Sequence, residues 1–362
     1  MPPFLAIGNE AVGWGALQAN CEAFFGYPIT PQNETAEWFA REFPARGKVF
    51  LQAPSETSAI NMVFGGASTG ARVLTSTSSP GWGLMQETMS HLANAELPCV
   101  VVLVQRGGPG QGTTRHAQMD YLSVTRGGGQ GGYKNLVLAP ASVQETHDLV
   151  QLAFHLAEKY RNPVVVLSDG VIGLTMEYLE VKTLDFGPLP PKDWAIEGTE
   201  KHPDSLKHYI LCGQGLVSWP PYQNYLSLLE ALNKKYQAMA QEELRYETWG
   251  LEDARLILVA YGYTSRVCRA AALAAREQGL PVGLVRPITL WPFPYEVIRQ
   301  KAHQGVPFLV VEDSLGQFVD DVRFGAEGRS PVHFLGVLAR HTPQEMGLIF
   351  PERVLEEIRR VL

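Results

Sequence analysis

The sequence contains few cysteines and no closely spaced pair of them. Its four cysteines lie far apart along 362 residues, at Cys21, Cys99, Cys212 and Cys268, and no C-x-x-C occurs. Iron–sulfur clusters, structural zinc sites and disulfide frameworks all need grouped cysteines. We therefore predict none of these in the chain and expect a reducing compartment, the cytoplasm.

Positive patches, long apolar runs and metal-binding motifs are also lacking. The formal net charge is -7, without a cluster of lysine or arginine that could follow a phosphate backbone, so nucleic acid is not an expected partner. No run approaches the roughly 18 apolar residues of a membrane span, and we predict a soluble protein without a membrane partner. The histidines show no metal-ligand spacing, so no metal site is predicted.

What the sequence does contain is an alternation of short β-branched runs with longer helical patterns. Predicted strands in the first half cover residues 72–77, 99–105, 135–140 and 163–169. Residues 142–160 repeat apolar side chains at helical spacing, and Ser142 followed by Glu145 is a capping-box pattern at the helix start. Strands that alternate with helices predict the α/β class, with a mainly parallel sheet covered by helices.

The same alternation restarts in the last third of the chain. Before it, residues 186–250 are rich in proline and charge and then carry a polar helical pattern near 222–246. The later predicted strands cover residues 254–262, 281–287, 306–313 and 331–337. We predict two doubly wound α/β domains with mainly parallel sheets, residues 1–185 and 251–362, joined by a linker with a helix, residues 186–250.

Two loops carry candidate binding chemistry. In the stretch GYPITPQNE, residues 26–34, Pro28 and Pro31 exclude a helix and favour an extended Thr30, so this stiff loop presents Thr30 in a defined conformation. Another loop follows the second predicted strand at its carboxyl end, where open α/β sheets bind ligands. Arg106 opens that loop and can hold a carboxylate in a bidentate fork, although a surface ion pair explains its position equally well.

Glu56 and Ser68 belong to one predicted helix, and each has a functional and a structural interpretation. Glu56 starts the helix among small and apolar residues, so its carboxylate is either a poorly solvated proton-transfer group or an acid that complements the helix dipole. Ser68 lies in a G-x-S-x-G pattern, and Asp313 and His341 follow it in the order of a hydrolase triad. The nucleophile elbow needs a strand before the serine, and a helix is predicted there, so an α/β-hydrolase-like esterase is the weaker interpretation.

Six motifs in order resemble the α subunit of 2-oxoacid:ferredoxin oxidoreductases, and most closely its 2-oxoisovalerate (3-methyl-2-oxobutanoate) type. They are GNEA (8–11), GYPITP (26–31), SETSAINMVFGGASTGARVLTSTSSPG (55–81), RGGPG (106–110), LAPASVQE (138–145) and RNPVVVLSDG (161–170). LVRPITLWPFP (284–294) and VVEDSLGQF (310–318) also fit, so the resemblance covers nearly the whole chain. It implies that the first domain is the pyrimidine-side thiamine-diphosphate domain and that the second is like the C-terminal domain of transketolase.

The resemblance also implies an activity, cofactors and partners. The family converts a 2-oxoacid to acyl-CoA and CO2 and reduces ferredoxin, with thiamine diphosphate, coenzyme A and iron–sulfur clusters. Its β subunit holds the diphosphate and Mg2+ through a G-D-G motif and an asparagine, whereas this chain has SDG at 168–170 and its next asparagine is Asn224. A β subunit, iron–sulfur and γ-type subunits and ferredoxin are therefore the implied partners. The loop 107–116 favours a branched-chain oxoacid, and its Arg115 keeps 2-oxoglutarate as the alternative.

Residue by residue, the resemblance assigns roles to the candidates. Glu56 matches the glutamate that hydrogen-bonds N1′ of the cofactor's aminopyrimidine, which makes it the expected catalytic residue. Thr30 matches a substrate-contacting threonine, and Arg106 matches the arginine near the substrate's carboxylate. Tyr27 and Pro28, in the same loop as Thr30, are assigned with Glu56 to cofactor binding.

Overall fold

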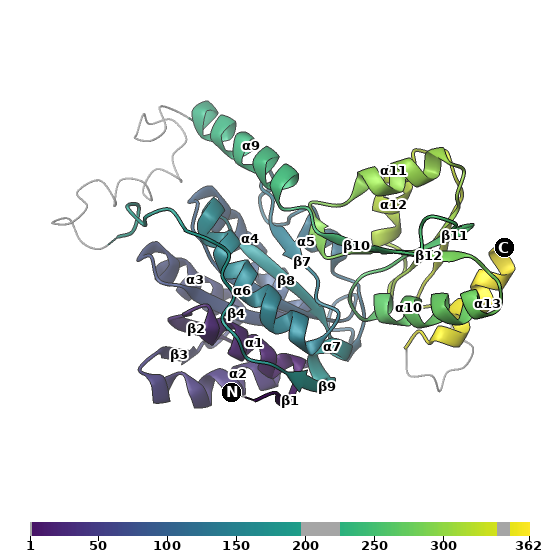
Figure 1. Cartoon of the computed structure of the whole chain (residues 1–362). Coiled ribbons are helices and arrows are strands. Elements are labelled where there is room, and N and C mark those ends of the chain that lie inside the picture. The colour runs from purple at the N-terminus through teal and green to yellow at the C-terminus, as the bar shows by residue number, and fades with distance from the viewer. Residues whose placement is uncertain (1, 197–224, 339–347) are drawn as a thin grey trace.

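The computed structural model describes residues 2–196, 225–338 and 348–362 of the chain. In this part of the chain, two open sheets with helices on both faces form two lobes that lie side by side (Figure 1). Most neighbouring strands in both sheets are parallel, which confirms the predicted fold class. No helix among the described residues is long and apolar enough to cross a membrane.

The first sheet comes from the N-terminal half of the chain and one strand from beyond it. Its order is β13 (Thr289–Trp291), β7 (Leu136–Leu138), β8 (Val164–Asp169), β5 (Val100–Gly107), β4 (Val73–Ser78), β2 (Ala23–Gly26) and β3 (Val49–Gln52). The strands from β7 to β3 are parallel, so their carboxyl ends lie at one edge of the sheet. The short β6 (Thr113–His116) turns back and pairs antiparallel with the end of β5.

Successive residues of the central strands enter two different cores. Val100, Val102 and Val104 of β5 belong to one core, whereas Val101 and Leu103 belong to the other. Helices α1 (Gly8–Gln18), α2 (Asn33–Glu42) and α6 (Val143–Tyr160) cover the first face, and α3 (Glu56–Ser68), α4 (Ser79–Asn94) and α5 (Tyr121–Thr125) cover the second. Burial on both faces explains why this strand is apolar throughout rather than alternating.

The second sheet repeats this plan with fewer strands. Its order is β10 (Tyr246–Trp249), β12 (Val282–Pro287), β11 (Leu256–Val259), β14 (Phe308–Val311) and β15 (Val332–Leu335). Helices α10 (Gly262–Glu277) and α13 (Pro351–Val361) cover one face, and α11 (Tyr295–His303) and α12 (Phe318–Ala326) cover the other. The four strands predicted from the last third of the sequence are confirmed.

Short strands escaped the sequence pattern. β1 (Phe4–Ile7) pairs antiparallel with β9 (Met176–Leu179) in a separate ribbon, which follows the short α7 (Gly170–Leu174). β13 crosses to the first lobe, where its Trp291 ring lies 6.3 Å from that of Tyr236 in α9 (Tyr225–Glu242). These short strands lack the continuous β-branched runs that marked the predicted ones, so neither an apolar run nor a period identified them.

The predicted capping box at the start of α6 is half correct. The Ser142 hydroxyl accepts from the Glu145 N–H at 3.1 Å, as predicted. The Glu145 carboxylate does not return to Ser142; it accepts from the Ala141 N–H at 2.9 Å and from Arg286 of β12 at 2.8 Å. A charged partner from the second lobe offers a stronger bond than a neutral amide, and the glutamate joins the two lobes.

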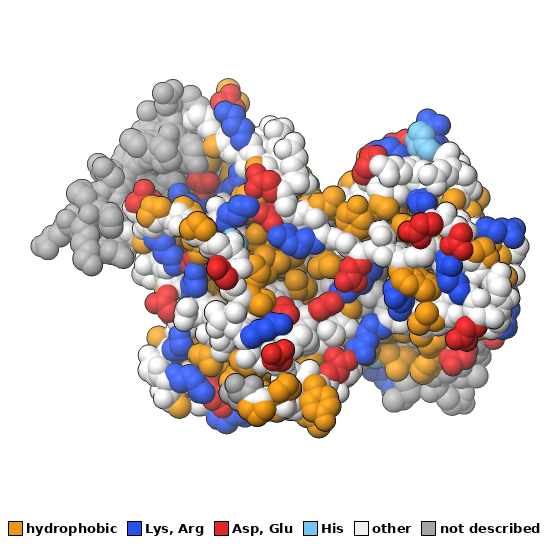
Figure 2. Space-filling model, viewed as in Figure 1, with side chains coloured by type: hydrophobic (Ala, Val, Ile, Leu, Met, Phe, Trp, Pro, Cys, Tyr) orange, Lys and Arg blue, Asp and Glu red, His pale blue; other side chains and the backbone are white. Residues whose placement is uncertain are grey.

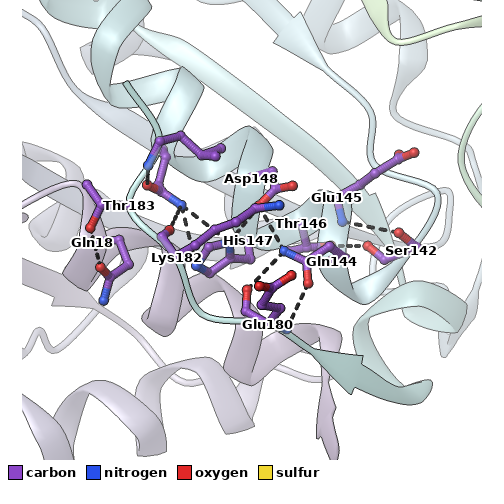
Figure 3. Close-up of polar contacts among 12 residues, drawn as sticks. Gln18, Ser142, Gln144, Glu145, Thr146, His147, Asp148, Glu180, Lys182 and Thr183 are labelled. Carbon is purple, nitrogen blue, oxygen red and sulfur yellow. Dashed lines mark hydrogen bonds and ion pairs between the residues drawn. The ribbon is translucent and has the colours of Figure 1, made fainter. Parts of the chain in front are cut away.

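Side-chain hydrogen bonds attach the segment after β9 to α1 and α6 (Figure 3). Gln144 donates to the Glu180 carbonyl at 3.1 Å and accepts from its N–H at 2.9 Å. Thr183 donates to Gln18 of α1 at 2.6 Å. These bonds fix the start of the connecting segment on the α1 and α6 face of the first lobe.

The two lobes share one hydrophobic core at their junction. Tyr121 of α5 and Tyr261, which follows β11, both contact the Phe318 ring of α12, with centroids 5.3 Å and 5.1 Å away. All three side chains are fully buried. Large buried aromatic contacts of this kind fix the orientation of one lobe on the other.

Replacing Phe318 should therefore destabilise the whole chain. We expect Phe318→Ala to reduce the free energy of unfolding by about 3–5 kcal/mol, because it opens a cavity between the lobes. Phe324→Ala is the matched control: its ring is 69% exposed, and the loss should stay below about 1 kcal/mol. Urea unfolding of the purified chain measures both, and equal losses would contradict the shared core.

Candidate functional site

The candidate site lies at the carboxyl edge of the first sheet. The loop after β2 holds Tyr27 to Gln32, the loop after β3 leads to Glu56, and Arg106 lies near the end of β5. Parallel strands bring these three segments to the same edge, although they are far apart in the sequence. The predicted placement of the loops at a ligand-binding edge thus agrees with the sheet topology.

Buried amides hold the loop after β2 in its conformation. Asn9 of α1 donates to the Pro31 carbonyl at 2.7 Å. Gln32 donates to the Tyr27 carbonyl at 3.2 Å and accepts from the Ser76 hydroxyl of β4 at 2.5 Å. Asn9 and Gln32 are almost completely buried, so the loop is anchored from both neighbouring elements. The stiffness predicted from the prolines is reinforced by polar anchors that the proline pattern did not reveal.

Arg106 is buried without a carboxylate partner. Its side chain is 6% exposed, and its guanidinium donates to the Thr30 carbonyl at 3.0 Å and to the Gln111 carbonyl and side chain at 3.0 Å and 3.2 Å. No ion pair to Arg106 occurs within the described residues, and its Nε has no partner there. The alternative of a surface ion pair is therefore wrong. A buried guanidinium with neutral acceptors alone is ready to receive an anion.

Glu56 is a second buried charge without a partner. It is 6% exposed and starts α3, whose N-cap Ser55 accepts from the Ser58 N–H at 3.1 Å. Among the described residues, no group forms a hydrogen bond or ion pair with the Glu56 carboxylate. A methyl group built on Gly81 of α4 would lie 2.1 Å from the Thr77 hydroxyl oxygen, 2.6 Å from Glu56 Cγ and 2.8 Å from Glu56 Oε1. The Glu56 side chain therefore occupies space that any side chain at position 81 would need.

The structure joins some of the predicted site residues and leaves others apart. Arg106 and Thr30 meet through the Thr30 carbonyl, while the exposed Thr30 hydroxyl accepts only from Asn33 at 3.3 Å among the described residues. Tyr27 is half-buried and Pro28 is exposed, and both lie in the loop that Gln32 anchors. No hydrogen bond or ion pair within the described residues links Glu56 to this loop or to Arg106. The site therefore consists of two charges of opposite sign at one sheet edge, without a bond between them.

Sequence reasoning missed Asp120 and Ser79. The Ser79 hydroxyl donates to the Asp120 carboxylate, and it accepts from the Arg106 N–H at 2.9 Å. Burial raises the pKa of Asp120 to about 6, although the Ser79 hydroxyl and the Arg106 charge both lower it. One signal was available, because Asp120 is the only acidic residue between Glu96 and Glu145.

The second lobe contacts β6, the strand that follows the Arg106 loop and pairs with the end of β5. His116, at the end of β6, lies opposite Arg106, and its Nδ1 is 2.9 Å from the buried Asp313 carboxylate. Tyr263 donates to the same carboxylate at 2.9 Å, and the Gln118 N–H donates to the Asp313 carbonyl at 2.8 Å. The position of the loop therefore depends on residues about 200 positions later in the sequence.

The esterase alternative does not agree with this geometry. Ser68 ends α3 and precedes β4, the reverse of the strand-to-helix order that a nucleophile elbow needs. Its hydroxyl donates to the Gly65 carbonyl of its own helix at 2.6 Å. Asp313 is engaged in the contact between the lobes, and His341 lies outside the described residues. Ser68 is thus a helix-end residue.

Two family models match successive parts of the chain. The family model "Pyruvate flavodoxin/ferredoxin oxidoreductase, thiamine diP-bdg" matches residues 14–247, and "Pyruvate:ferredoxin oxidoreductase core domain II" matches residues 254–345. The chain belongs to the 2-oxoacid:ferredoxin oxidoreductase family, so the resemblance found in the sequence is confirmed.

Two kinds of subunit within this family differ in their sequence identity to the chain. Ketoisovalerate oxidoreductase subunit VorB of Methanothermobacter marburgensis is 45% identical over 88% of each chain, and that of Methanothermobacter thermautotrophicus is 44% identical over 98% of this chain and 96% of its own. The 2-oxoglutarate synthase subunit KorA of Methanothermobacter thermautotrophicus is 35% identical over 94% of this chain and 96% of its own. The closer likeness is thus to the subunits named for ketoisovalerate.

A solved structure shares the architecture of nearly the whole chain. It is 2-oxoglutarate:ferredoxin oxidoreductase from Magnetococcus marinus with 2-oxoglutarate, coenzyme A and succinyl-CoA bound, at 27% identity and a TM-score of 0.83. The alignment covers 99% of this chain and 65% of that one, so this chain spans about two thirds of its length. A split-gene transketolase, at 13% identity and a TM-score of 0.58, shares the fold alone, over 98% of this chain and 96% of its own.

The closeness of Gly81 to Glu56 makes two neighbouring glycines a matched test of site geometry. Gly81→Ala should lower the free energy of unfolding by about 1–3 kcal/mol, because the new methyl group overlaps the Thr77 hydroxyl, 2.1 Å away, and the Glu56 side chain. Gly83→Ala, two residues later in α4, meets nothing within 4 Å and should raise it by about 0.5–1 kcal/mol. Thermal unfolding of the purified chain compares them, and equal shifts would show that Thr77 and Glu56 do not close the space beside Gly81.

Proposed function

We propose that this chain is the α subunit of a 2-oxoacid:ferredoxin oxidoreductase that acts on 3-methyl-2-oxobutanoate and similar branched-chain oxoacids. The reaction is oxidative decarboxylation to acyl-CoA and CO2, with reduction of ferredoxin. The observation that carries the proposal is the buried Arg106, which lacks a counter-ion among the described residues and lies against the Thr30 loop. An anionic 2-oxoacid carboxylate would supply the missing charge.

Glu56 fits the pyrimidine side of thiamine diphosphate. A buried carboxylate with no partner among the described residues needs a donor, and the protonated N1′ of an aminopyrimidine is one. When bound, thiamine diphosphate supplies a carbon nucleophile that attacks the 2-oxo group and accepts the electron pair released with CO2. Glu56 would hold the proton at N1′, while Tyr27 and Pro28 would border the cofactor from the loop after β2.

Arg106 and Thr30 would orient the substrate beside that position. A guanidinium fork fixes the carboxylate and thereby the 2-oxo carbon, which lowers the entropic part of the barrier. The Thr30 hydroxyl, exposed at the end of the loop, would contact the substrate. The backbone beside each side chain is anchored, because Asn9 donates to the Pro31 carbonyl and the Arg106 N–H donates to the Ser79 hydroxyl.

A β subunit would complete the cofactor site by holding the diphosphate and Mg2+. In this chain the carboxylate of Asp169, within SDG at 168–170, accepts from the N–H groups of Val171 and Ile172 at 3.0 Å. It also accepts from the Tyr263 N–H at 3.2 Å, so it caps α7 and joins the lobes rather than facing a ligand. Iron–sulfur and γ-type subunits, coenzyme A and ferredoxin complete the proposed assembly, in the cytoplasm.

The division of labour within the chain is part of the same proposal. Residues 1–185 would form the pyrimidine-side domain, residues 186–250 the linker, and residues 251–362 the transketolase-C-terminal-like domain. We propose that residues 251–362 hold the first domain in place. Two contacts between the domains favour this role, His116 with Asp313 and Glu145 with Arg286.

Glu56 provides the direct test of the cofactor assignment. In the assembled complex, Glu56→Gln and Glu56→Ala should lower the decarboxylation rate by roughly 100- to 10,000-fold, because proton transfer at N1′ is lost. Glu37→Gln, an exposed glutamate of α2, is the matched control and should retain full activity. Near-normal turnover by the Glu56 variants would show that Glu56 has no catalytic role. Turnover by the isolated chain would show that no β subunit is needed to complete the site.

Substrate choice separates the proposal from its alternative. The complex should show a kcat/KM for 3-methyl-2-oxobutanoate at least about tenfold above that for 2-oxoglutarate, because a second carboxylate would need a second buried cation. Ferredoxin reduction with each oxoacid measures the ratio. A preference for 2-oxoglutarate would instead assign the complex to that substrate, with the exposed Arg115 as the first residue to replace.

A further inference from the structure

Asp120 lies close to Arg106 but does not pair with it. The Ser79 hydroxyl stands between them, donating to the Asp120 carboxylate and accepting from the Arg106 N–H at 2.9 Å. The guanidinium itself is turned toward Thr30 and Gln111. A negative charge is thus held beside the buried cation without neutralising it.

The backbone of Asp120 is also held in place. The Asp120 N–H donates to the Gln105 side chain at 3.2 Å, and the Asp120 carbonyl accepts from the Ser123 hydroxyl at 2.8 Å and from the Val124 N–H at 3.1 Å. These bonds hold the backbone of Asp120, and the bond from the Ser79 hydroxyl holds its carboxylate. The charge of Asp120 is thereby kept beside Arg106, whose backbone N–H donates to the same hydroxyl.

We propose that Asp120 is a positioning residue that acts through Arg106, weakening the attraction of the guanidinium for the substrate's carboxylate. This inference rests on the proposed role of Arg106. The physical reason is that the carboxylate's charge disappears when CO2 leaves, so an arginine that binds it too strongly stabilises the ground state more than the transition state. A fixed negative charge behind the cation reduces that attraction and leaves the fork geometry unchanged.

Few titratable groups bear on Asp120. In the described part of the chain, Arg106 from β5 is the charged side chain that lowers its pKa. Tyr261, from the second lobe, also lies close, and burial raises its pKa well above its ordinary value, so it stays neutral. Protonation of Asp120, whose pKa is about 6, should therefore strengthen anion binding as the pH falls from 7.5 to 5.5.

The test uses an anion that cannot be decarboxylated. In the assembled complex, 2-hydroxy-3-methylbutanoate should inhibit Asp120→Asn with a Ki roughly three- to tenfold lower than wild type. Structural damage would raise the Ki, so the sign separates the two effects. Asp320→Asn, an exposed aspartate of α12, should leave the Ki unchanged. The wild-type Ki should fall as the pH is lowered through 6, and that of Asp120→Asn should stay flat.

Arg106→Ala distinguishes failure of this inference from failure of the proposed function. If Arg106→Ala leaves the Ki unchanged, Arg106 does not bind the carboxylate and both proposals for this side chain fall. If Arg106→Ala raises the Ki but Asp120→Asn does not lower it, the role of Asp120 alone is overturned. Should Asp120→Asn fail to assemble, the wild-type pH series decides, because a flat Ki between pH 7.5 and 5.5 contradicts the proposal.

Discussion

A guanidinium buried without a counter-ion is the constraint on which this site depends. Removing such a charge from water is costly, so the surrounding chain must supply acceptors that do not neutralise it. Arg106 receives them from the loop after β2 and from its own loop, through Thr30 and Gln111. The buried amides of Asn9 and Gln32 hold the first loop, and the hydroxyl of the half-buried Ser79 accepts from the Arg106 N–H at the start of the second. The positive charge is therefore presented to the sheet edge by a rigid frame.

The second lobe belongs to that frame although it contributes none of the proposed site residues. Its buried Asp313 holds His116, and His116 ends the strand that pairs with Arg106. The aromatic junction around Phe318 fixes the lobe that carries Asp313. Because a buried carboxylate is expensive to leave unpaired, this contact also resists separation of the lobes. The second lobe thus restricts the loop that begins at Arg106 and ends at His116.

The sequence was most informative where patterns are long or motifs are local. Apolar strands such as 99–105 and the helix of residues 142–160 were predicted well, because burial on both faces and helical spacing leave clear signals. The placement of Arg106 at a strand's carboxyl end followed from the same reasoning. Asp120, Ser79 and the His116–Asp313 contact could not be predicted, since they depend on tertiary neighbours that no local period encodes. The side chain of Thr30 was expected to matter, whereas Arg106 bonds to its carbonyl.

Glu56 and Arg106 share an unusual property. Each is a buried charge without an ionic partner among the described residues, and no bond between them compensates both. Evolution of a stable monomer would favour pairing or replacing such groups, because an unpaired buried charge lowers stability. Their presence would be explained if ligands and a partner subunit supplied the opposite charges and donors. The stability that the free chain loses to these unpaired groups would then be recovered on binding. A buried group without a partner contributes more binding free energy than one that is already hydrogen-bonded.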